Sequence, residues 1–380
     1  MVTSSNDSFV HLHTHTEYSM LDGAARLTEL FDETERLGMP ALATTDHGYL
    51  FGAFDFWKKA TDKGIKPIIG VEAYVTPGTA RGDKERVRWG DESQRKDDVS
   101  GGGSYTHMTL LSYNNAGMRN LFRASSIASL DSVFGKWPRL DRELLNTYSE
   151  GLIATTGCPS GEVQTRLRLG QYREALAAAS EFRDIFGAEN YFCELMDHGL
   201  DIERRVTGDL LRLAKELKLP LVATNDLHYT HEHDAKAHEA LLAIQSGSTL
   251  LEPTYDNGGS RFAFSGSGYY LKSPQEMREL FRDHPEACDN TLLIAERCEV
   301  SFNTGANYMP RFPALPARTR RPGSSRKWPR DSITATRTAS RTRCASKPTM
   351  SLTSSRPWAS RATSSWWPTS STGQRTTESG

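Results

Sequence analysis

The sequence predicts an α/β protein folded as a distorted (β/α)7 barrel of the TIM type. Seven short apolar runs rich in β-branched residues alternate with amphipathic stretches, and a repeated strand-then-helix order is typical of a parallel sheet. Gly-Met-Pro at 38–40 and Gly-Ile-Lys-Pro at 64–67 are the stop signals expected where a helix is followed by a strand. Seven such units could close into a barrel, which fits best, or remain an open doubly wound sheet.

Each element is placed by its own pattern. Strands are expected at 9–13, 40–45, 66–75, 106–112, 151–156, 190–195 and 220–225. Helices are expected at 26–37, 53–63, 116–130, 161–186 (as two helices) and 202–217. The polar stretch 77–104 is too long for an ordinary connection, so we expect a mobile excursion near the rim of the barrel.

The formal charge of -1 conceals two unlike segments. Residues 314–380 hold 11 Arg and 2 Lys against Asp331 and Glu378, a balance of +11, which leaves -12 for residues 1–313. The four Cys of residues 1–313 show no paired spacing, no apolar run reaches the ~18 residues of a membrane span, and the N-terminus has no signal pattern. We therefore expect a cytoplasmic protein without membrane contact.

The tail at 314–380 has no helical or strand period and is expected to be disordered. It could be a natural basic extension that binds nucleic acid. The alternative is a shifted reading frame beginning near 314–320, because Arg, Ser, Thr, Pro and Ala are common products of GC-rich codons read out of register. The segment 358–368, with its paired Trp, can be back-translated so that a neighbouring frame encodes an apolar sequence. The nucleotide sequence of the gene would decide between these two hypotheses.

Side chains able to bind metals recur where the expected strands end. They are His13, His15, Asp22, His47, Glu72, His107, Cys158, Asp226 and His228. The carboxyl ends of parallel barrel strands share one face, and residues i and i+2 of a strand point to the same side. The His-x-His and Asp-x-His spacings therefore predict one rim at which imidazoles, carboxylates and a thiol hold several divalent cations and support hydrolysis.

Taken singly, these signals are weak. A lone His-x-His is more often a surface pair, Asp-His at a strand end is often a turn, and Cys158 alone would be a small buried residue. Glu72 is the hardest to explain without a ligand, because a carboxylate in an apolar strand needs a partner. Coincidence across six strand ends favours the metal site.

Several other polar residues are interpreted as structural. His231, His233 and His238 are expected to be solvated at the start of a polar helix, and Glu194, Asp197 and His198 are expected to support the ligands from behind. Lys272, Arg166, Arg168 and Arg173 could contact phosphates, although a solvated helix face is the favoured interpretation.

Five motifs resemble the N-terminal polymerase-and-histidinol-phosphatase (PHP) domain of the bacterial DNA polymerase III alpha family, of the actinobacterial type. They are FVHLHTHTEYSMLDG at 9–23, GMPALATTDHG at 38–48, GIKPIIGVEAY at 64–74, TGCPSG at 156–161 and ATNDLHY at 223–229. The resemblance covers about residues 8–313. It implies domain bounds of 1–285 for the PHP domain and 286–313 for a linker towards a polymerase palm, whose helix would have a partly uncovered apolar face. The resemblance does not extend into the tail at 314–380.

The resemblance also implies three cations, Zn²⁺ or Mn²⁺, and a ligand set for each. His13, His15, Glu72 and Asp226 would hold the first, Glu72, His107 and Cys158 the second, and Asp22, His47 and His228 the third. The implied activity is a proofreading 3′-5′ exonuclease acting on a DNA 3′ end that it binds weakly alone, with the sliding clamp and other replicase subunits as partners. A small-molecule phosphatase and a non-catalytic scaffold are the alternatives. Polymerase activity is not expected, because the palm carboxylates would lie beyond residue 380.

Overall fold

The structure is a computed structural model that describes residues 7–306 apart from 96, 99–100, 255–256 and 260. The predictions for the tail at 314–380 lie outside these residues. In the described part, no helix combines the length and the apolar character needed to cross a membrane.

A ring of strands forms the centre of the fold. Neighbouring strands pair in the order β1 (Ala41–Thr44), β2 (Lys66–Val75), β3 (Thr106–Ser112), β6 (Leu152–Thr155), β7 (Tyr191–Leu195) and β8 (Leu221–Ala223). The first predicted strand, 9–13, is not a regular strand, but the adjoining residues close the ring. On one side the carbonyl of His11 accepts from the Ala43 amide at 3.0 Å, and on the other the His15 amide donates to the Leu227 carbonyl at 2.7 Å. The barrel therefore has seven sides, as predicted, and is distorted.

One strand runs against the prediction of an all-parallel sheet. β3 is antiparallel to both neighbours, with Glu72 opposite Thr109 and Leu110 opposite Ala154. Because of this reversal, the beginning of β3 lies at the rim formed by the carboxyl ends of the other strands. His107, the second residue of β3, therefore reaches the same rim as Glu72.

The interior of the barrel is apolar, and each side contributes to it. Its core comprises Val10, Leu12, Ala41, Ala43, Ile68, Leu111, Ile153, Phe192 and Val222. Helix α10 (Pro285–Arg297) adds Ile294 and Ala295 to this cluster, followed by Cys298. In each parallel side the core residues precede the metal-capable residues, so α10 packs at the end of the barrel away from the rim.

This packing corrects the expectation that the helix within 286–313 would leave its apolar face partly uncovered. Ala287, Cys288 and Ile294 are fully buried, whereas Leu293 faces outward. Asn290 Nδ2 also donates to the Leu221 carbonyl at 2.7 Å, which ties α10 to β8. The apolar face is covered by the barrel itself.

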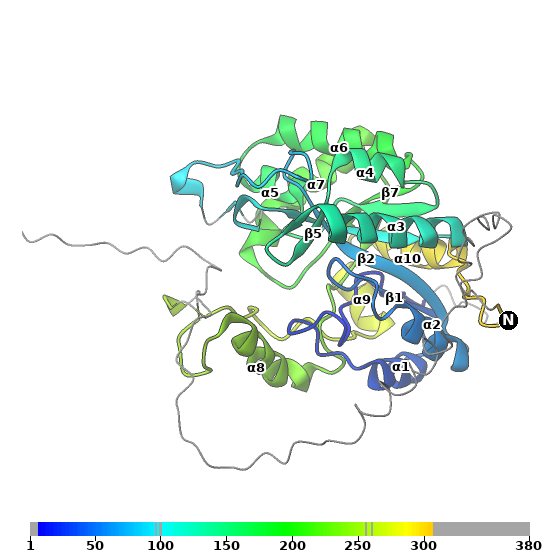
Figure 1. Ribbon diagram of the computed structural model, residues 1–380. Coiled ribbons are helices and arrows are strands. Elements are labelled where there is room, and N and C mark those ends of the chain that lie inside the picture. Colours follow the sequence, from blue (N-terminus) through cyan, green and yellow to red (C-terminus); the bar gives the residue numbers. More distant parts are fainter. Residues whose placement is uncertain (1–6, 96, 99–100, 255–256, 260, 307–380) are drawn as a thin grey trace, which may run out of the picture. The chain divides into compact units, whose positions relative to one another are not determined.

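Helices surround the ring (Figure 1). The predicted ones are present as α1 (Leu27–Arg36), α2 (Ala53–Asp62), α3 (Asn115–Asp131), α5 (Glu162–Arg168), α6 (Tyr172–Phe186) and α7 (Asp201–Leu217). The strands and α-helices not predicted are β4 (Val133–Phe134), β5 (Trp137–Leu140), α4 (Arg142–Thr147) and α9 (Pro274–Leu280), whereas α8 (Ala235–Ser246) follows the predicted start of a polar helix. β5 extends the sheet beside the end of β2, where Tyr74 pairs with Arg139.

The described residues of the 77–104 excursion are tied to neighbouring helices. Asp97 forms an ion pair with Arg205 of α7, and its carbonyl accepts from Arg168 Nε at 3.2 Å. The ring of Trp89 lies 4.2 Å from the Arg166 guanidinium of α5. These contacts place the excursion against α5 and α7.

Candidate metal centre

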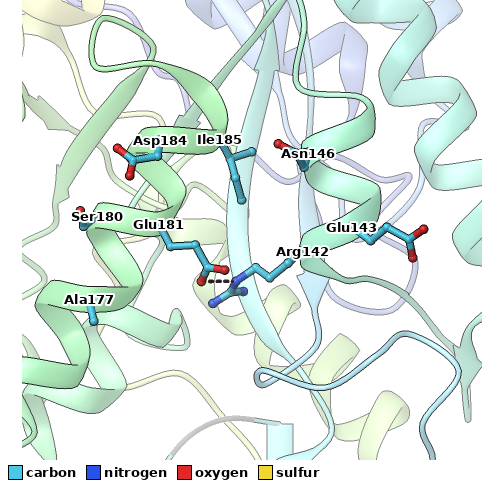
Figure 2. Close-up of a pocket in the computed structure, with 8 residues that line it drawn as sticks. All are labelled: Arg142, Glu143, Asn146, Ala177, Ser180, Glu181, Asp184 and Ile185. Carbon is cyan, nitrogen blue, oxygen red and sulfur yellow. Dashed lines mark hydrogen bonds and ion pairs between the residues drawn. The ribbon is translucent and has the colours of Figure 1, made fainter.

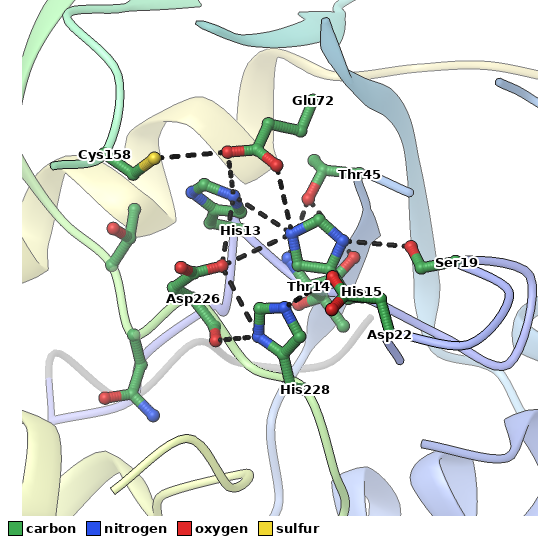
Figure 3. A network of polar contacts seen from close by, with 12 residues as sticks. His13, Thr14, His15, Ser19, Asp22, Thr45, Glu72, Cys158, Asp226 and His228 are labelled. Carbon is green, nitrogen blue, oxygen red and sulfur yellow. Dashed lines mark hydrogen bonds and ion pairs between the residues drawn. The ribbon is translucent and has the colours of Figure 1, made fainter. Parts of the chain in front are cut away.

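All nine side chains selected from the sequence meet at one rim of the barrel, and Figure 3 shows most of them directed at a common centre. They are His13, His15, Asp22, His47, Glu72, His107, Cys158, Asp226 and His228. Three overlapping groups have ligand atoms within 4.8 Å of one another, each built on three of these residues.

Glu72 of β2 stands at the middle of the cluster. Its Oε1 lies 2.9 Å from His107 Nδ1 and 3.3 Å from both His13 Nε2 and Cys158 Sγ. Its Oε2 lies 2.7 Å from His47 Nδ1. One carboxylate therefore contacts groups from four other segments of the chain, as a bridging ligand would.

His13, His15 and Asp226 gather on one side of Glu72. Both imidazole Nε2 atoms lie 3.3 Å from Asp226 Oδ1 and 3.3 Å from each other. Because His13 and His15 are two residues apart on an extended segment, their rings point to the same side, as the His-x-His spacing predicted.

Asp22 lies beside His47 and His228. Asp22 Oδ2 lies 2.5 Å from His47 Nε2 and 3.3 Å from His228 Nε2. The His15 ring lies between the other two rings, with centroids 4.1 Å from that of His47 and 4.4 Å from that of His228.

Cys158 and His107 complete the cluster, with Cys158 Sγ 3.8 Å from His107 Nδ1. Gly157 makes this approach possible: it has a φ of 86°, and a side chain there would meet the His107 carbonyl at 2.5 Å. The His107 amide also donates to the Ser160 carbonyl at 3.1 Å, which fixes the loop against β3.

A buried carboxylate behind the cluster orients His13. Glu194 Oε1 lies 2.8 Å from His13 Nδ1 and accepts from Thr224 Oγ1 at 2.7 Å, while Thr155 donates to Oε2. When Nδ1 donates to this carboxylate, the lone pair of Nε2 faces the centre. The supporting role expected for Glu194 fits this geometry.

His15 is oriented by a relay that was not predicted from the sequence. Ser19 Oγ lies 3.0 Å from His15 Nδ1 and donates to Asp46 Oδ1 at 2.7 Å. Asp46 also accepts from the Thr16 amide at 2.7 Å and from Thr44 Oγ1 at 2.9 Å. The Asp46-His47 pair marked a strand end in the sequence, but the convergence of hydroxyl groups on Asp46 arises only in the folded chain.

Asp226 is held in an uncommon backbone conformation, with a φ of 44°. The preceding Asn225 is fixed on several sides. Its Nδ2 donates to the Gly268 and Tyr270 carbonyls, both at 2.9 Å, and its Oδ1 accepts from Lys272 Nζ at 2.8 Å. A tightly held neighbour allows Asp226 to keep a conformation that would otherwise relax.

Burial and charge act strongly on the ionisable groups. Burial would lower the pKa of His47, but the carboxylates of Glu72 and Asp22 outweigh it and raise that pKa to about 10. Burial, with the nearby His47 and His228, lowers the pKa of His15 to about 3. Burial also raises the pKa of the Cys158 thiol well above its usual range. A divalent cation could replace the protons on His47 and Cys158.

Access to the cluster is uneven. The side chains of His13 and His15 have no exposed surface, and that of Glu72 is 2% exposed. His47 and Asp226 are 19% and 18% exposed. The first three form a floor, and the others line a mouth through which a substrate could approach.

One direct observation supports a metal cluster at these residues. Among the described residues, Glu72 Oε2, His47 Nδ1 and Asp226 Oδ1 are buried and make no well-oriented hydrogen bond, although Glu72 Oε2 and His47 Nδ1 lie 2.7 Å apart as an ion pair. Buried polar atoms without a partner are costly, and here they face one another inside the cluster. Cations among them would satisfy these atoms.

Three expectations for neighbouring residues were wrong. His238 is buried rather than solvated, and its Nε2 lies 2.7 Å from the Asp22 carbonyl. Arg168 is also buried and donates to the Pro159 carbonyl. Lys272 binds Asn225 rather than facing solvent. Each of these residues is a structural support. The expectations were wrong because the sequence does not show which connections cover these residues.

A surface hollow of about 760 Å³ lies apart from the centre (Figure 2). It separates α4 from α6 and is crossed by the Arg142 to Glu181 ion pair at 2.9 Å. None of the nine metal-capable residues lines it.

The class of the domain follows from a family match, since residues 11–198 match the PHP domain family. DNA polymerase III subunit alpha of Mycobacterium tuberculosis (strain H37Rv) is 57% identical over 314 residues, which cover 82% of this chain and 26% of the relative. The same subunit of Saccharopolyspora erythraea is 58% identical over 317 residues, with 81% and 26% covered. An amidohydrolase structure from Chromobacterium violaceum covers 59% of this chain and 89% of its own at 17% identity, with a TM-score of 0.34.

The chain belongs to the DNA polymerase III alpha family and corresponds to its PHP portion, of the actinobacterial type. It spans about a quarter of the length of these relatives.

Proposed function

We propose that this domain is a metal-dependent 3′-5′ exonuclease that removes nucleotides from a DNA 3′ end. The observation that supports it best is the position of Glu72, whose two oxygens contact His13, His47, His107 and Cys158 in a buried cluster with an open mouth. Bound cations would supply polarisation of the phosphoryl group and activation of the attacking water.

The proposed ligand sets divide the nine side chains among three cations. One cation would bind between His13, His15, Glu72 and Asp226, a second between Glu72, His107 and Cys158, and a third between Asp22, His47 and His228. Imidazole and thiolate ligands favour Zn²⁺ or Mn²⁺ over Mg²⁺.

The protein residues have separate tasks in this reaction. His13 and His15 are held by Glu194 and Ser19 so that each presents a lone pair to the centre. His47 and Asp226, at the mouth, would lie nearest the scissile phosphate. The surrounding barrel excludes water from the floor, which strengthens these electrostatic interactions.

The proposed setting is a replicase in which other parts deliver the DNA. The domain carries a formal charge of -12 over residues 1–313, so it would bind a phosphate backbone weakly alone. In full-length relatives the sliding clamp and further replicase subunits would be its partners, and the cytoplasm its place of action.

The test is nucleotide release from the 3′ end of labelled single-stranded DNA, with metal content measured on the same samples. Wild type should release mononucleotides in Mn²⁺ or Zn²⁺, whereas His13→Ala and Asp226→Asn should lose both metal and activity. Fully metallated wild type that releases nothing would favour a scaffold. Release of phosphate from histidinol phosphate but not from DNA would favour a small-molecule phosphatase.

A further inference from the structure

Large apolar side chains are exposed beside the mouth of the metal centre. Phe51 is 68% exposed and Met20 is 76% exposed. They lie within four residues of His47 and Asp22, on the two loops that carry these groups. The loops touch, since a side chain at Gly52 would meet the Tyr18 ring at 2.5 Å. Exposed apolar surface at the edge of a polar site indicates a ligand with an apolar face.

The exposed ring of Phe51 is part of a stack. It lies on Tyr49 with a centroid distance of 4.6 Å and an interplanar angle of 12°. The Tyr49 hydroxyl donates to the Lys136 carbonyl at 3.3 Å, which joins the stack to the turn between β4 and β5. The stack is thus a flat, braced platform.

Further rings connect this side of the mouth to the metal-capable residues. Trp137, next to Lys136, lies 4.9 Å from Tyr105, which stacks on His107 at 5.5 Å and 12°. Lys136 adds a cation to this side of the mouth. Burial lowers the pKa of Lys136, and the Asp22 carboxylate opposes that shift.

We propose that Tyr49 and Phe51, with Lys136 beside them, form a binding site for the terminal bases and an adjoining phosphate of a single-stranded 3′ end. The site rests on the proposed function, because a scissile phosphate in the mouth would place its own base next to these rings. Aromatic faces accept any base, so the site recognises an unpaired 3′ end without preference for sequence.

The test measures binding without hydrolysis. The probe is a fluorescein-labelled thymidine oligonucleotide whose 3′-terminal linkage is a phosphorothioate, together with the same oligonucleotide ending in an abasic residue. Anisotropy titrations use the full chain in about 200 mM salt, which suppresses non-specific binding by the basic residues of 314–380 common to every variant.

Phe51→Ala should raise the Kd for the normal oligonucleotide about tenfold and that for the abasic one less than about twofold. Lys136→Gln should weaken the binding of both oligonucleotides equally, because both carry the phosphate that this cation would contact. Phe54→Ala is the matched control: Phe54 is 43% exposed three residues further on, but its ring packs on Phe302, 5.4 Å away, so both Kd values should stay at wild type.

Equal losses for both oligonucleotides in Phe51→Ala, or no loss in either, would overturn the base site. Nucleotide release from an unmodified oligonucleotide is scored separately. Base-dependent binding without release would remove the proposed function and leave this site standing, whereas release without base-dependent binding would remove the site alone.

Discussion

Glu72 is the residue on which the proposed metal centre depends most. Glu194 supports the same centre indirectly, through its contact with His13. Glu72→Gln keeps the shape but removes the charge that four neighbours share. We expect metal affinity to fall more than about a hundredfold, against about ten- to a hundredfold for Glu194→Gln, which only orients His13. Metal content after dialysis against graded chelator measures both.

The control for these variants is Glu279→Gln, an exposed residue paired with Arg282 on the surface. It should retain wild-type metal content. A Glu72→Gln protein that keeps its full complement of metal would show that the carboxylate is not a bridge.

Lys272 gives a pH dependence that lies outside the metal ligands. Burial lowers the pKa of Lys272 to about 8 from a usual value of 10.5, so the unfolded chain binds more protons between these limits and stability rises with pH there. From pH 7 to pH 9 the wild type should gain about 1 kcal/mol relative to Lys272→Met. Urea unfolding at both pH values tests this.

Lys58→Met serves as the comparison, because Lys58 is 57% exposed in an ion pair with Asp62. Its stability should follow the wild-type pH dependence. If Lys272→Met follows it equally, the ammonium is not destabilised by its surroundings.

At the scale of elements, the periodic strands and helices could be predicted, and the departures have physical causes. Residues 106–112 read as a strand, but apolar alternation does not encode direction, so the reversal of β3 was invisible although it alone explains why His107 reaches the rim. Residues 9–13 carry strand-like residues but pair too irregularly to form a strand. α8 has no strong apolar stripe, so the burial of His238 could not be foreseen.

The candidate site was more accessible to prediction than its supports. Residues that can bind metals are recognised in the sequence by their type and by their position at strand ends, and all nine lie together in the structure. The hydroxyls of Ser19 and Thr224 carry no such signal, because a hydrogen bond to Asp46 or Glu194 depends on tertiary contacts.

Replacing glycine by alanine should have opposite effects on stability at two helical positions. In α3, a side chain at Gly117 would lie 1.9 Å from the Gly151 carbonyl, whereas nothing lies within 4 Å at Gly208 of α7. Gly117→Ala should therefore destabilise the protein by about 1–3 kcal/mol, and Gly208→Ala should stabilise it by about 0.5–1 kcal/mol. Denaturant titrations measure the change in the free energy of unfolding for each variant. A Gly117→Ala protein that is as stable as the wild type, or more stable, would show that the α3 contact can relax.

For the whole molecule, the metal centre should act as a clasp, because its ligands come from segments spread from His13 to His228. A ligand present at 100 times its Kd stabilises the folded state by about 2.7 kcal/mol. Chelation should thus lower the melting temperature by about 5–10 °C, and Zn²⁺ or Mn²⁺ should restore it better than Mg²⁺. Glu72→Gln should melt at the same temperature with and without chelator, and a wild type that does the same would contradict the clasp.

The seat of α10 also sets how short a working piece of this protein can be. The PHP match ends at 198, and the predicted domain bound was 285, yet the ring includes β8 at 221–223 and its apolar core includes Ile294 and Cys298. A chain that ended at 198 would lack β8 and α10, and one that ended at 285 would lack nearly all of α10. In either case water would reach the apolar core, and the exposed apolar surface would favour aggregation. Anyone wishing to study the domain by itself should keep the chain through residue 302.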